Sequence, residues 1–441
     1  MDLSKLSEDF AGLVWGTPLI VLLFGTHLFL TWRTGFIQRF MGRAIKISFS
    51  KEKEGDGDVT QFGALMTALA ATIGAGNIAG VATAVTTGGP GAVFWMWLTG
   101  VFGIATKYGE AVLAVKYRVQ NPDGTFAGGP MYVLERGMGQ KWLGVVFAVL
   151  TAFAAVGIGN MYQANMVVGL LNEHVKPAST EVLKWSAGLV MAALTAASIL
   201  GGVKSIARWC SVLVPVMAVG YVVGCLLILG KNVTLIPGAI SEILTSAFDG
   251  TAVAGGLLGG VVKAGIKRGL FSNESGLGSA PIVAAAAQTR NPIRQALVSA
   301  TGTFWDTVVI CLMTGLVLVT SGHYKEGLQG PALMNAAFSE LSTVGPIILI
   351  FGLATFVFST ILGWSYYGER ALEYLFGQKA IKPYRILWVV LVVVGSVQPA
   401  SVIINFSDAA NGLMAIPNLI ALIALSGVIA AETRAHKDEF K

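Results

Sequence analysis

Apolar residues form long, uninterrupted stretches along most of this 441-residue chain, and short polar segments separate them. The stretches at 145–170 and 347–364, for example, contain no charged residue. Their lengths match the roughly 20 residues with which a helix crosses a bilayer, and they lack the apolar–polar alternation of membrane barrels. Because lipid leaves the backbone to satisfy its own hydrogen bonds, this pattern predicts an all-α integral membrane protein.

We predict eleven membrane-spanning segments within one membrane domain. The first, at 11–33, is longer than the apolar core of a signal peptide and follows a net acidic leader, so we expect a retained helix. The segment at 252–288 is too long and too rich in glycine for one straight helix, and it predicts a short outer helix followed by a broken helix. The remaining spans are expected at 62–85, 91–115, 143–170, 182–202, 209–230, 296–320, 345–369, 384–400 and 403–431.

Composition and charge agree with a membrane protein. Hydrophobic residues make up 54% of the chain and charged residues 12%, against roughly 25% charged residues in soluble domains. The net charge of +6 does not indicate nucleic-acid binding, because the basic residues form no basic-aromatic stripe. Twenty-one of the 30 lysines and arginines fall on one predicted side of the membrane and eight on the other. This excess predicts a multi-pass protein of the cell membrane (plasma or inner), with its N-terminus outside and its C-terminus cytoplasmic.

Two spans carry glycines in a pattern that single packing glycines do not explain. Segments 70–80 and 271–281 each contain Gly-x-Gly followed by a small polar residue, and alanine-rich stretches follow both. They lie about 200 residues and five spans apart, so they cross the membrane in opposite senses. Such a pair is the sequence signature of an inverted repeat with two discontinuous helices. The alternative is a pair of small-residue faces for close helix packing.

At these positions the chain resembles the alanine or glycine:cation symporters, a family within the large group that shares the leucine-transporter fold. The resemblance covers nearly the whole chain and is carried by residues 68–83, 107–118, 128–137, 157–166 and 269–287. It implies a five-plus-five inverted repeat, with 61–230 as the first repeat and 250–431 as the second, after an extra N-terminal helix at 11–33. It also implies symport of alanine or glycine with sodium or protons by alternating access.

The substrate site is expected at the two breaks. Backbone N–H groups freed near Gly74 and Gly76, at the positive end of a half-helix, are expected to bind a carboxylate. Gln163 offers a polar head from the fourth span, and Trp364 is expected to cap the side-chain space; interhelical packing is the alternative for both. The full predicted set is Thr72, Gly74, Gly76, Asn77, Gln163, Phe271, Ser272, Asn273, Gly276 and Trp364.

A cation site is expected beside the first break. Backbone carbonyls there and a hydroxyl pair in the ninth span supply neutral oxygens, which suffice for a monovalent ion such as sodium. By resemblance to the fold's sodium sites, Asn77 supplies a side-chain oxygen close to the substrate. Ser359 and Thr360 are expected to complete a second, substrate-remote site with Ala70 and Ile73. For the hydroxyl pair the alternative is hydrogen bonding back to its own helix. The predicted set is Ala70, Thr72, Ile73, Asn77, Ser359 and Thr360.

Four ionisable residues lie within or near the spans, where charge costs several kcal/mol unless it finds a partner. Lys107 and Glu110 are spaced i,i+3, so we expect them to satisfy each other as a structural pair. Glu274, at the second break, is expected to attract a cation or to take up a proton. Asp306 receives no role from the sequence.

Other classes of function fit less well. The four histidines lie near span ends or in loops without an HExxH or a nucleophile–base spacing, so we expect neither an enzyme nor catalytic residues. A channel stays open as an alternative, because broken helices also line pores. Proton coupling through Glu274 is the main alternative among carriers. With no Arg or Lys at the predicted pocket, we expect small zwitterions as substrates; the oligomeric state stays open.

Overall fold

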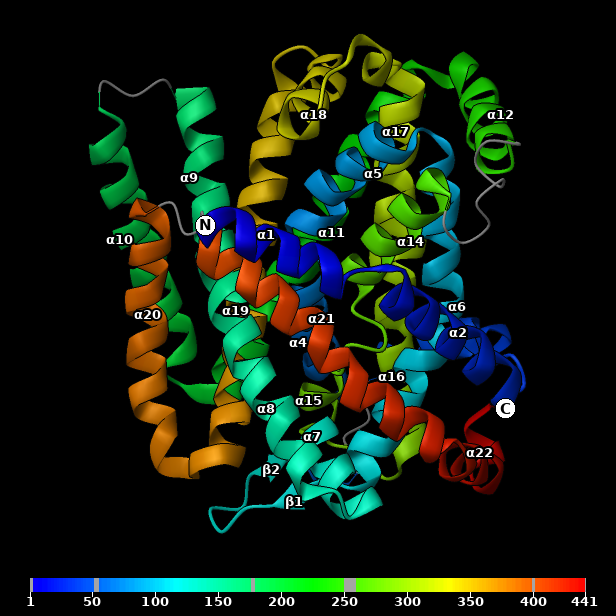
Figure 1. The fold of residues 1–441 in the computed structure, drawn as a ribbon, viewed down its shortest axis with the longest axis vertical. Helices are drawn as coiled ribbons and strands as arrows, with labels where there is room; N and C mark the ends of the chain where they lie inside the picture. The colour runs from blue at the N-terminus through cyan, green and yellow to red at the C-terminus, as the bar shows by residue number, and fades with distance from the viewer. Residues whose placement is uncertain (1–2, 51–54, 176–178, 250–258, 399–400, 441) are drawn as a thin grey trace.

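The computed structural model describes residues 3–50, 55–175, 179–249, 259–398 and 401–440, and most of these residues are helical (Figure 1). Among them, nine helices are long and apolar enough to cross a membrane, or ten when one bent pair counts as a single span. The prediction of an all-α, multi-pass membrane protein is therefore confirmed. The number of eleven spans and the division into two repeats stay predictions.

Among the described residues, the helices that meet the length criterion are either single α-helices or successive helical elements along one span. Three of them contain a π-helical turn or a short interruption, at residues 15–16, 157–161 and 304–311. The elements are α1 (Leu3–Val14) with α2 (Thr17–Arg33), α6 (Gly91–Lys116), α8 (Lys141–Val156) with η4 (Gly157–Met161) and α9 (Tyr162–Val175), α10 (Thr180–Ile199), α11 (Gly202–Lys231), α16 (Pro292–Thr303) with η7 (Phe304–Cys311) and α17 (Leu312–Ser321), α19 (Val344–Phe376), α20 (Ile381–Val397) and α21 (Ser401–Ala424).

The first broken helix is present where the sequence predicts it. α4 (Gln61–Thr72) ends, Ile73 and Gly74 leave the helical path, and the chain resumes as η2 (Gly76–Gly80) and α5 (Val81–Gly88) at an angle of 53°. Ile73 adopts an extended conformation with ψ of 92°. Because the last carbonyls of α4 and the first N–H groups of η2 lack partners within a helix, both kinds of group are available at this point.

The second broken helix differs in detail from the prediction. α14 (Gly260–Asn273) ends, seven non-helical residues follow, and α15 (Pro281–Ala284) resumes the helix. Glu274, Gly276 and Gly278 all have positive φ, which glycine tolerates and glutamate rarely adopts. The short outer helix that we expected at the start of 252–288 falls on residues 252–258, which lie outside the described residues. A short helix, α12 (Ile236–Ala247), lies earlier in the chain. Pro237 near the start of α12 favours a helix start there.

The two broken helices lie in the interior of the helix assembly. α4 packs against α11, α16 and α19, whereas α14 packs against α5 and α6. α1 and α2 run beside α21 across one face, and α10 lies beside α20 at the periphery (Figure 1). In Figure 1, α12 and α18 (Gly330–Ser339) lie at one end of the assembly, and β1 (Val119–Gln120), β2 (Phe126–Ala127) and α7 (Pro130–Tyr132) lie at the other. The remaining short elements are η1 (Ile37–Phe40), α3 (Met41–Ser48), η3 (Val133–Gly137), η5 (Val233–Leu235), η8 (His323–Glu326), η9 (Gln378–Ala380), α22 (Ser426–Ala435) and η10 (Lys437–Phe440).

The predicted cytoplasmic ends of the broken helices are hydrogen-bonded to each other. The Asp58 N–H donates to the Ala286 carbonyl at 2.8 Å, and the Gln288 N–H donates to the Val59 carbonyl at 2.7 Å. The guanidinium of Arg118 spans the junction by donating to the Ala287 carbonyl at 2.9 Å and to a carbonyl just before α4. The segment that precedes α4 is therefore tied to the segment that follows α15.

Candidate functional site

A small cavity of about 30 Å³ lies against the first break. Seven of the ten residues predicted for a substrate site line it, and they come from α4, η2, α9, α14 and α19. Asn77, Asn273 and Gly276 do not line it, whereas Ala71, Ala75, Ile158, Glu274, Thr360 and Asn411 also do. The seven predicted lining residues are Thr72, Gly74, Gly76, Gln163, Phe271, Ser272 and Trp364.

The two glycines of the first break face different neighbours. The Gly74 N–H donates to Asn77 Oδ1 at 2.9 Å, which satisfies that freed amide within the protein. A Cβ at Gly74 would lie 2.6 Å from Thr360 Oγ1, so the backbone approaches α19 as closely as only glycine permits. Gly76 is the first residue of η2, where an N–H has no partner within the helix. A Cβ at Gly76 would make ordinary contact with Phe271 at 3.7 Å.

Two buried amide oxygens line the cavity without a hydrogen-bond partner in the described part of the chain. They are Gln163 Oε1 and Asn411 Oδ1. The amide nitrogen of Gln163 is already fixed by donating to the Ile158 carbonyl at 3.0 Å. A buried polar atom without a partner costs about 1–3 kcal/mol, so two of them beside one cavity mark positions where a ligand donor would be stabilised. Asn411 could not be singled out from the sequence, because α21 carries several small polar residues.

Trp364 reaches the cavity because a glycine-containing turn makes room for it. A Cβ at Gly159, in the π-helical turn η4, would lie 2.5 Å from the Cβ of Trp364. The indole is buried and packs edge-on against Tyr367, with ring centroids 5.5 Å apart. Gly159 therefore allows α19 to bring an indole into contact with the middle of the span that carries Gln163.

The predicted cation ligands of α4 and α19 lie close together. Ser359 Oγ donates to the Ala70 carbonyl at 3.2 Å as well as to the Phe356 carbonyl of its own helix at 2.8 Å. Thr360 Oγ1 donates to the same Phe356 carbonyl at 2.9 Å and lies against Gly74. The hydroxyls thus bond back to their own helix and also face the end of α4. The hydroxyls and the carbonyl are all neutral oxygen ligands, which fit a monovalent cation.

Asn77 has other partners than the expected cation. Its Oδ1 accepts from Gly74, and its Nδ2 donates to Asp306 Oδ1 at 2.6 Å. Asp306 Oδ2 in turn accepts from Ser272 Oγ at 3.0 Å and from Thr307 Oγ1 at 2.6 Å. Asp306, to which the sequence assigned no role, therefore connects the first break to α14. Its position in the middle of an apolar span was the available signal.

The second break is held by side chains from α6 and α21. Glu110 Oε1 accepts from the N–H groups of Gly276 and Gly278, both at 3.0 Å, and from Asn418 Nδ2 at 2.8 Å. Asn418 also donates to the Gly276 carbonyl at 2.9 Å. The expected pairing of Lys107 with Glu110 is wrong, since no ion pair joins them in the described ranges. The freed backbone amides bind the carboxylate instead, as charge-assisted hydrogen bonds.

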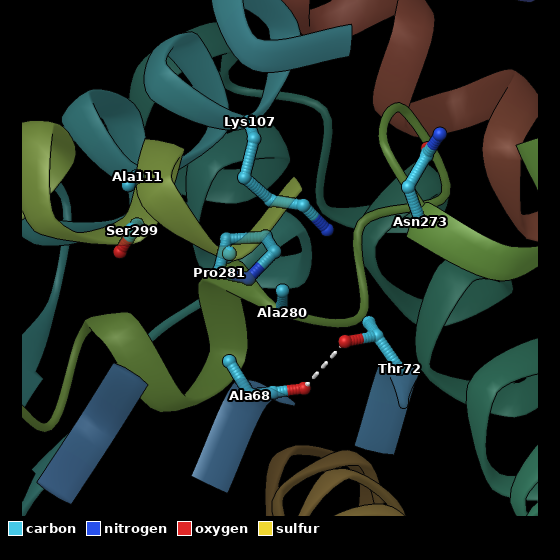
Figure 2. A pocket seen from close by; sticks show the side chains of 9 residues that line it. Ala68, Thr72, Lys107, Ala111, Asn273, Ala280, Pro281 and Ser299 are labelled. Atoms are coloured by element: carbon cyan, nitrogen blue, oxygen red, sulfur yellow. Dashed lines mark hydrogen bonds between the residues drawn. The ribbon is translucent and has the colours of Figure 1, made fainter. Parts of the chain in front are cut away.

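Asn273 and Glu274, at the end of α14, line two different cavities. The carboxylate of Glu274 accepts from the Ser279 hydroxyl and also lines the central cavity. Asn273 Oδ1 accepts from the Ser275 N–H at 2.9 Å. Asn273 lines a second, smaller cavity together with Thr72 and Lys107 (Figure 2). The same figure shows Thr72 Oγ1 donating back to the Ala68 carbonyl of α4.

A wider cavity of about 150 Å³ adjoins the central one. Phe271 and Ile158 line both cavities and therefore lie between them. Two basic residues, Lys267 and Arg268, line the wider cavity with Asp408. Asp408 Oδ1 accepts from the Trp15 indole N–H at 3.1 Å, so the N-terminal helix contributes to this region.

Comparisons with known proteins agree on one family. The full chain, residues 1–441, matches the sodium:alanine symporter family. It is 50% identical to the sodium/alanine symporter AgcS of Methanococcus maripaludis, over 99% of this chain and 98% of that protein. It is 37% identical to the probable sodium/glutamine symporter GlnT of Bacillus subtilis, over 95% of this chain and 87% of that protein.

Solved structures agree on the fold. The structure of MhsT in complex with L-phenylalanine has a TM-score of 0.61 to this chain at 14% sequence identity, and the match covers 86% of this chain and 99% of that one. This likeness confirms the predicted leucine-transporter type of fold.

Proposed function

Because the chain belongs to the sodium:alanine symporter family, whose relatives are transporters rather than enzymes, we propose that it imports alanine or glycine together with sodium by alternating access. The observation that carries the proposal is the cavity at the first break, which is lined by Gly76 at the start of η2 and by two residues with unpartnered amide oxygens. A zwitterion needs donors for its carboxylate and acceptors for its ammonium, and this cavity offers both.

The substrate carboxylate binds at the start of η2, near Gly76, where the half-helix N-terminus favours negative charge. Its ammonium donates to Gln163 Oε1 and Asn411 Oδ1, which have no other partner in the described residues. Its side chain points toward Phe271 and Trp364. A cavity of about 30 Å³ has room for only a few atoms, since one water needs about 10–15 Å³ by this measure. The smallest amino acids are therefore favoured over glutamine or aromatic ones.

Sodium binds between α4 and α19, with Ala70 and Ile73 providing carbonyls and Ser359 and Thr360 providing hydroxyls. The proximity of Ser359 to the Ala70 carbonyl and of Thr360 to Gly74 supports this site. A cation held there connects the broken helix to α19, and Thr360 and Gly74 also line the substrate cavity. Ion binding and substrate binding therefore order the same segment of backbone, which is a physical basis for coupling.

Alternating access to the two sides of the membrane depends on a difference between the two ends of the broken helices. The predicted cytoplasmic ends are tied through the Asp58 and Gln288 amides and through Arg118. On the other side, Phe271 and Ile158 line both the central cavity and the wider one. We infer that substrate enters through the wider cavity and that release requires the cytoplasmic ties to open.

Uptake of radiolabelled alanine into proteoliposomes tests the proposal, with sodium and pH gradients imposed separately. An inward sodium gradient should drive accumulation, and an equal proton gradient without sodium should not. Excess glycine should compete, whereas excess aspartate or lysine should not. Accumulation driven by protons alone, and lost in Glu274→Gln, would replace sodium by protons as the coupling ion. Sodium-independent flux without accumulation would indicate a channel.

A further inference from the structure

Lys107 is a buried cation that the proposed transport mechanism does not yet use. It lies on α6 with 3% of its surface exposed, and its Nζ has no hydrogen-bond partner in the described part of the chain. A buried charge without a partner is expensive, so its retention in the middle of the protein calls for a reason. The pairing with Glu110 that the sequence predicted does not supply one, because Glu110 Oε1 holds the second break.

The side chain of Lys107 ends where the two broken helices terminate. It lines a cavity of about 10 Å³ with Thr72, the last residue of α4, and Asn273, the last residue of α14. Figure 2 shows its amine in the space between Pro281 and Asn273, above Ala280 and Thr72. The final carbonyls of a helix lack partners and carry partial negative charge. Two such helix ends therefore converge on one ammonium group.

Acidic side chains add to the negative charge of this junction. Glu110, Glu274 and Asp306 are each buried and each within electrostatic reach of Lys107. Carboxyl groups therefore outnumber ammonium groups here by three to one. His27, which also faces Lys107, is hydrogen-bonded to Thr106. The junction thus favours a cation, whereas a bound anion such as chloride would add to the excess.

We propose that Lys107 is a tethered cation that takes the place of a second coupling ion, so that one sodium ion accompanies each amino acid. The proposal rests on the function proposed above. Thr72 lines both the Lys107 cavity and the substrate cavity, so a mobile cation between α4 and α19 and a fixed one on α6 would act on opposite sides of the same helix end. Because the fixed charge never leaves, it cannot contribute to the energy of accumulation.

The stoichiometry of accumulation tests this inference directly. In proteoliposomes with a roughly tenfold sodium gradient and the membrane potential held at zero, one ion per alanine sustains about tenfold accumulation and two ions about a hundredfold. The wild-type protein is expected to reach the lower limit. A hundredfold limit in the wild type would overturn the inference while leaving the proposed symport intact, whereas no sodium-driven accumulation would overturn the symport itself.

Variants at position 107 separate charge from volume. Lys107→Ala removes the charge and opens space, and we expect a second sodium ion to enter and the limit to rise toward a hundredfold. Lys107→Met removes the charge but fills the space, so its limit should remain tenfold. Lys116→Met is the control, because Lys116 also lies on α6 but pairs with Glu432 at the helix end. An unchanged limit in Lys107→Ala would contradict the inference.

Direct binding provides a second readout that needs no variant. Purified wild-type protein saturated with alanine should bind one radioactive sodium ion per chain. Two ions per chain would overturn the inference even if Lys107→Ala fails to give monodisperse protein.

Discussion

The two breaks carry the same Gly-x-Gly pattern, yet the protein treats them differently. At the second break, the amides of Gly276 and Gly278 bind the carboxylate of Glu110, and Asn418 binds both that carboxylate and the Gly276 carbonyl. At the first break, Asn77 holds Gly74, whereas Gly76 begins a half-helix beside the central cavity. The freed backbone groups of the second break thus have hydrogen-bond partners within the protein, whereas the first break keeps backbone groups that a ligand can bind.

This difference assigns separate tasks to the two broken helices. A break whose freed groups already have charged partners keeps its shape in the absence of ligand, because those hydrogen bonds are strong. A break with available donors and acceptors gains order only when ion and substrate bind. We expect the second broken helix to act as the fixed wall of the site and the first as its responsive wall.

Removing the clamp of the second break should have the largest effect. Glu110→Ala strands two buried backbone amides at about 1–3 kcal/mol each, so the midpoint of thermal unfolding in detergent should fall markedly. The midpoint of thermal unfolding of Glu110→Gln should fall by less than that of Glu110→Ala. Glu135→Gln is the control, because its partner Lys141 is exposed and exposed pairs contribute about 0–1 kcal/mol. A Glu110→Ala protein as stable as the control would show that the clamp is not needed.

Substitutions of the two glycines in the first break should separate its two contacts. Gly74→Ala forces a Cβ to within 2.6 Å of Thr360 Oγ1, and overpacking of this kind costs about 1–3 kcal/mol. Sodium-dependent alanine affinity should fall by about tenfold or more. Gly76→Ala has room for its Cβ and should bind alanine nearly normally, whereas Gly76→Val should crowd the carboxylate position. Equal effects of Gly74→Ala and Gly76→Ala on alanine binding would contradict the geometry.

Removing the unpartnered acceptors should weaken substrate binding without unfolding the protein. Gln163→Ala and Asn411→Ala each delete one proposed ammonium acceptor, and each should lower alanine affinity by about 1–3 kcal/mol. Asn335→Ala is a matched control, since Asn335 Oδ1 is also buried without a partner in the described residues but lies on α18, away from the cavity. Binding of labelled alanine to monodisperse protein measures all three. Wild-type alanine affinity in both cavity variants would show that Gln163 and Asn411 do not bind the substrate.

The sequence predicts elements better than it predicts partners. Apolar runs and glycine pairs are local patterns, so most spans and both breaks could be located from them. Glu110 and Asn418, by contrast, lie 308 positions apart, and the partners of a buried carboxylate depend on which helices the fold brings together. The i,i+3 spacing of Lys107 and Glu110 therefore predicted an ion pair that does not form, because freed backbone amides compete for the carboxylate oxygen of Glu110. Asn411 and Asp306 were missed for the same reason.

The central claim is that one sodium ion, held between α4 and α19, sets the affinity for alanine. Alanine affinity is measured across a sodium series at fixed pH in the wild type, in Ser359→Ala/Thr360→Ala and in Thr355→Ala. Thr355 is a control on the same helix, since its hydroxyl donates only to its own helix among the described residues. Wild type and Thr355→Ala should show sodium raising affinity by about 5–150-fold, and the double variant should show a factor near one. An undiminished factor in the double variant would contradict the account.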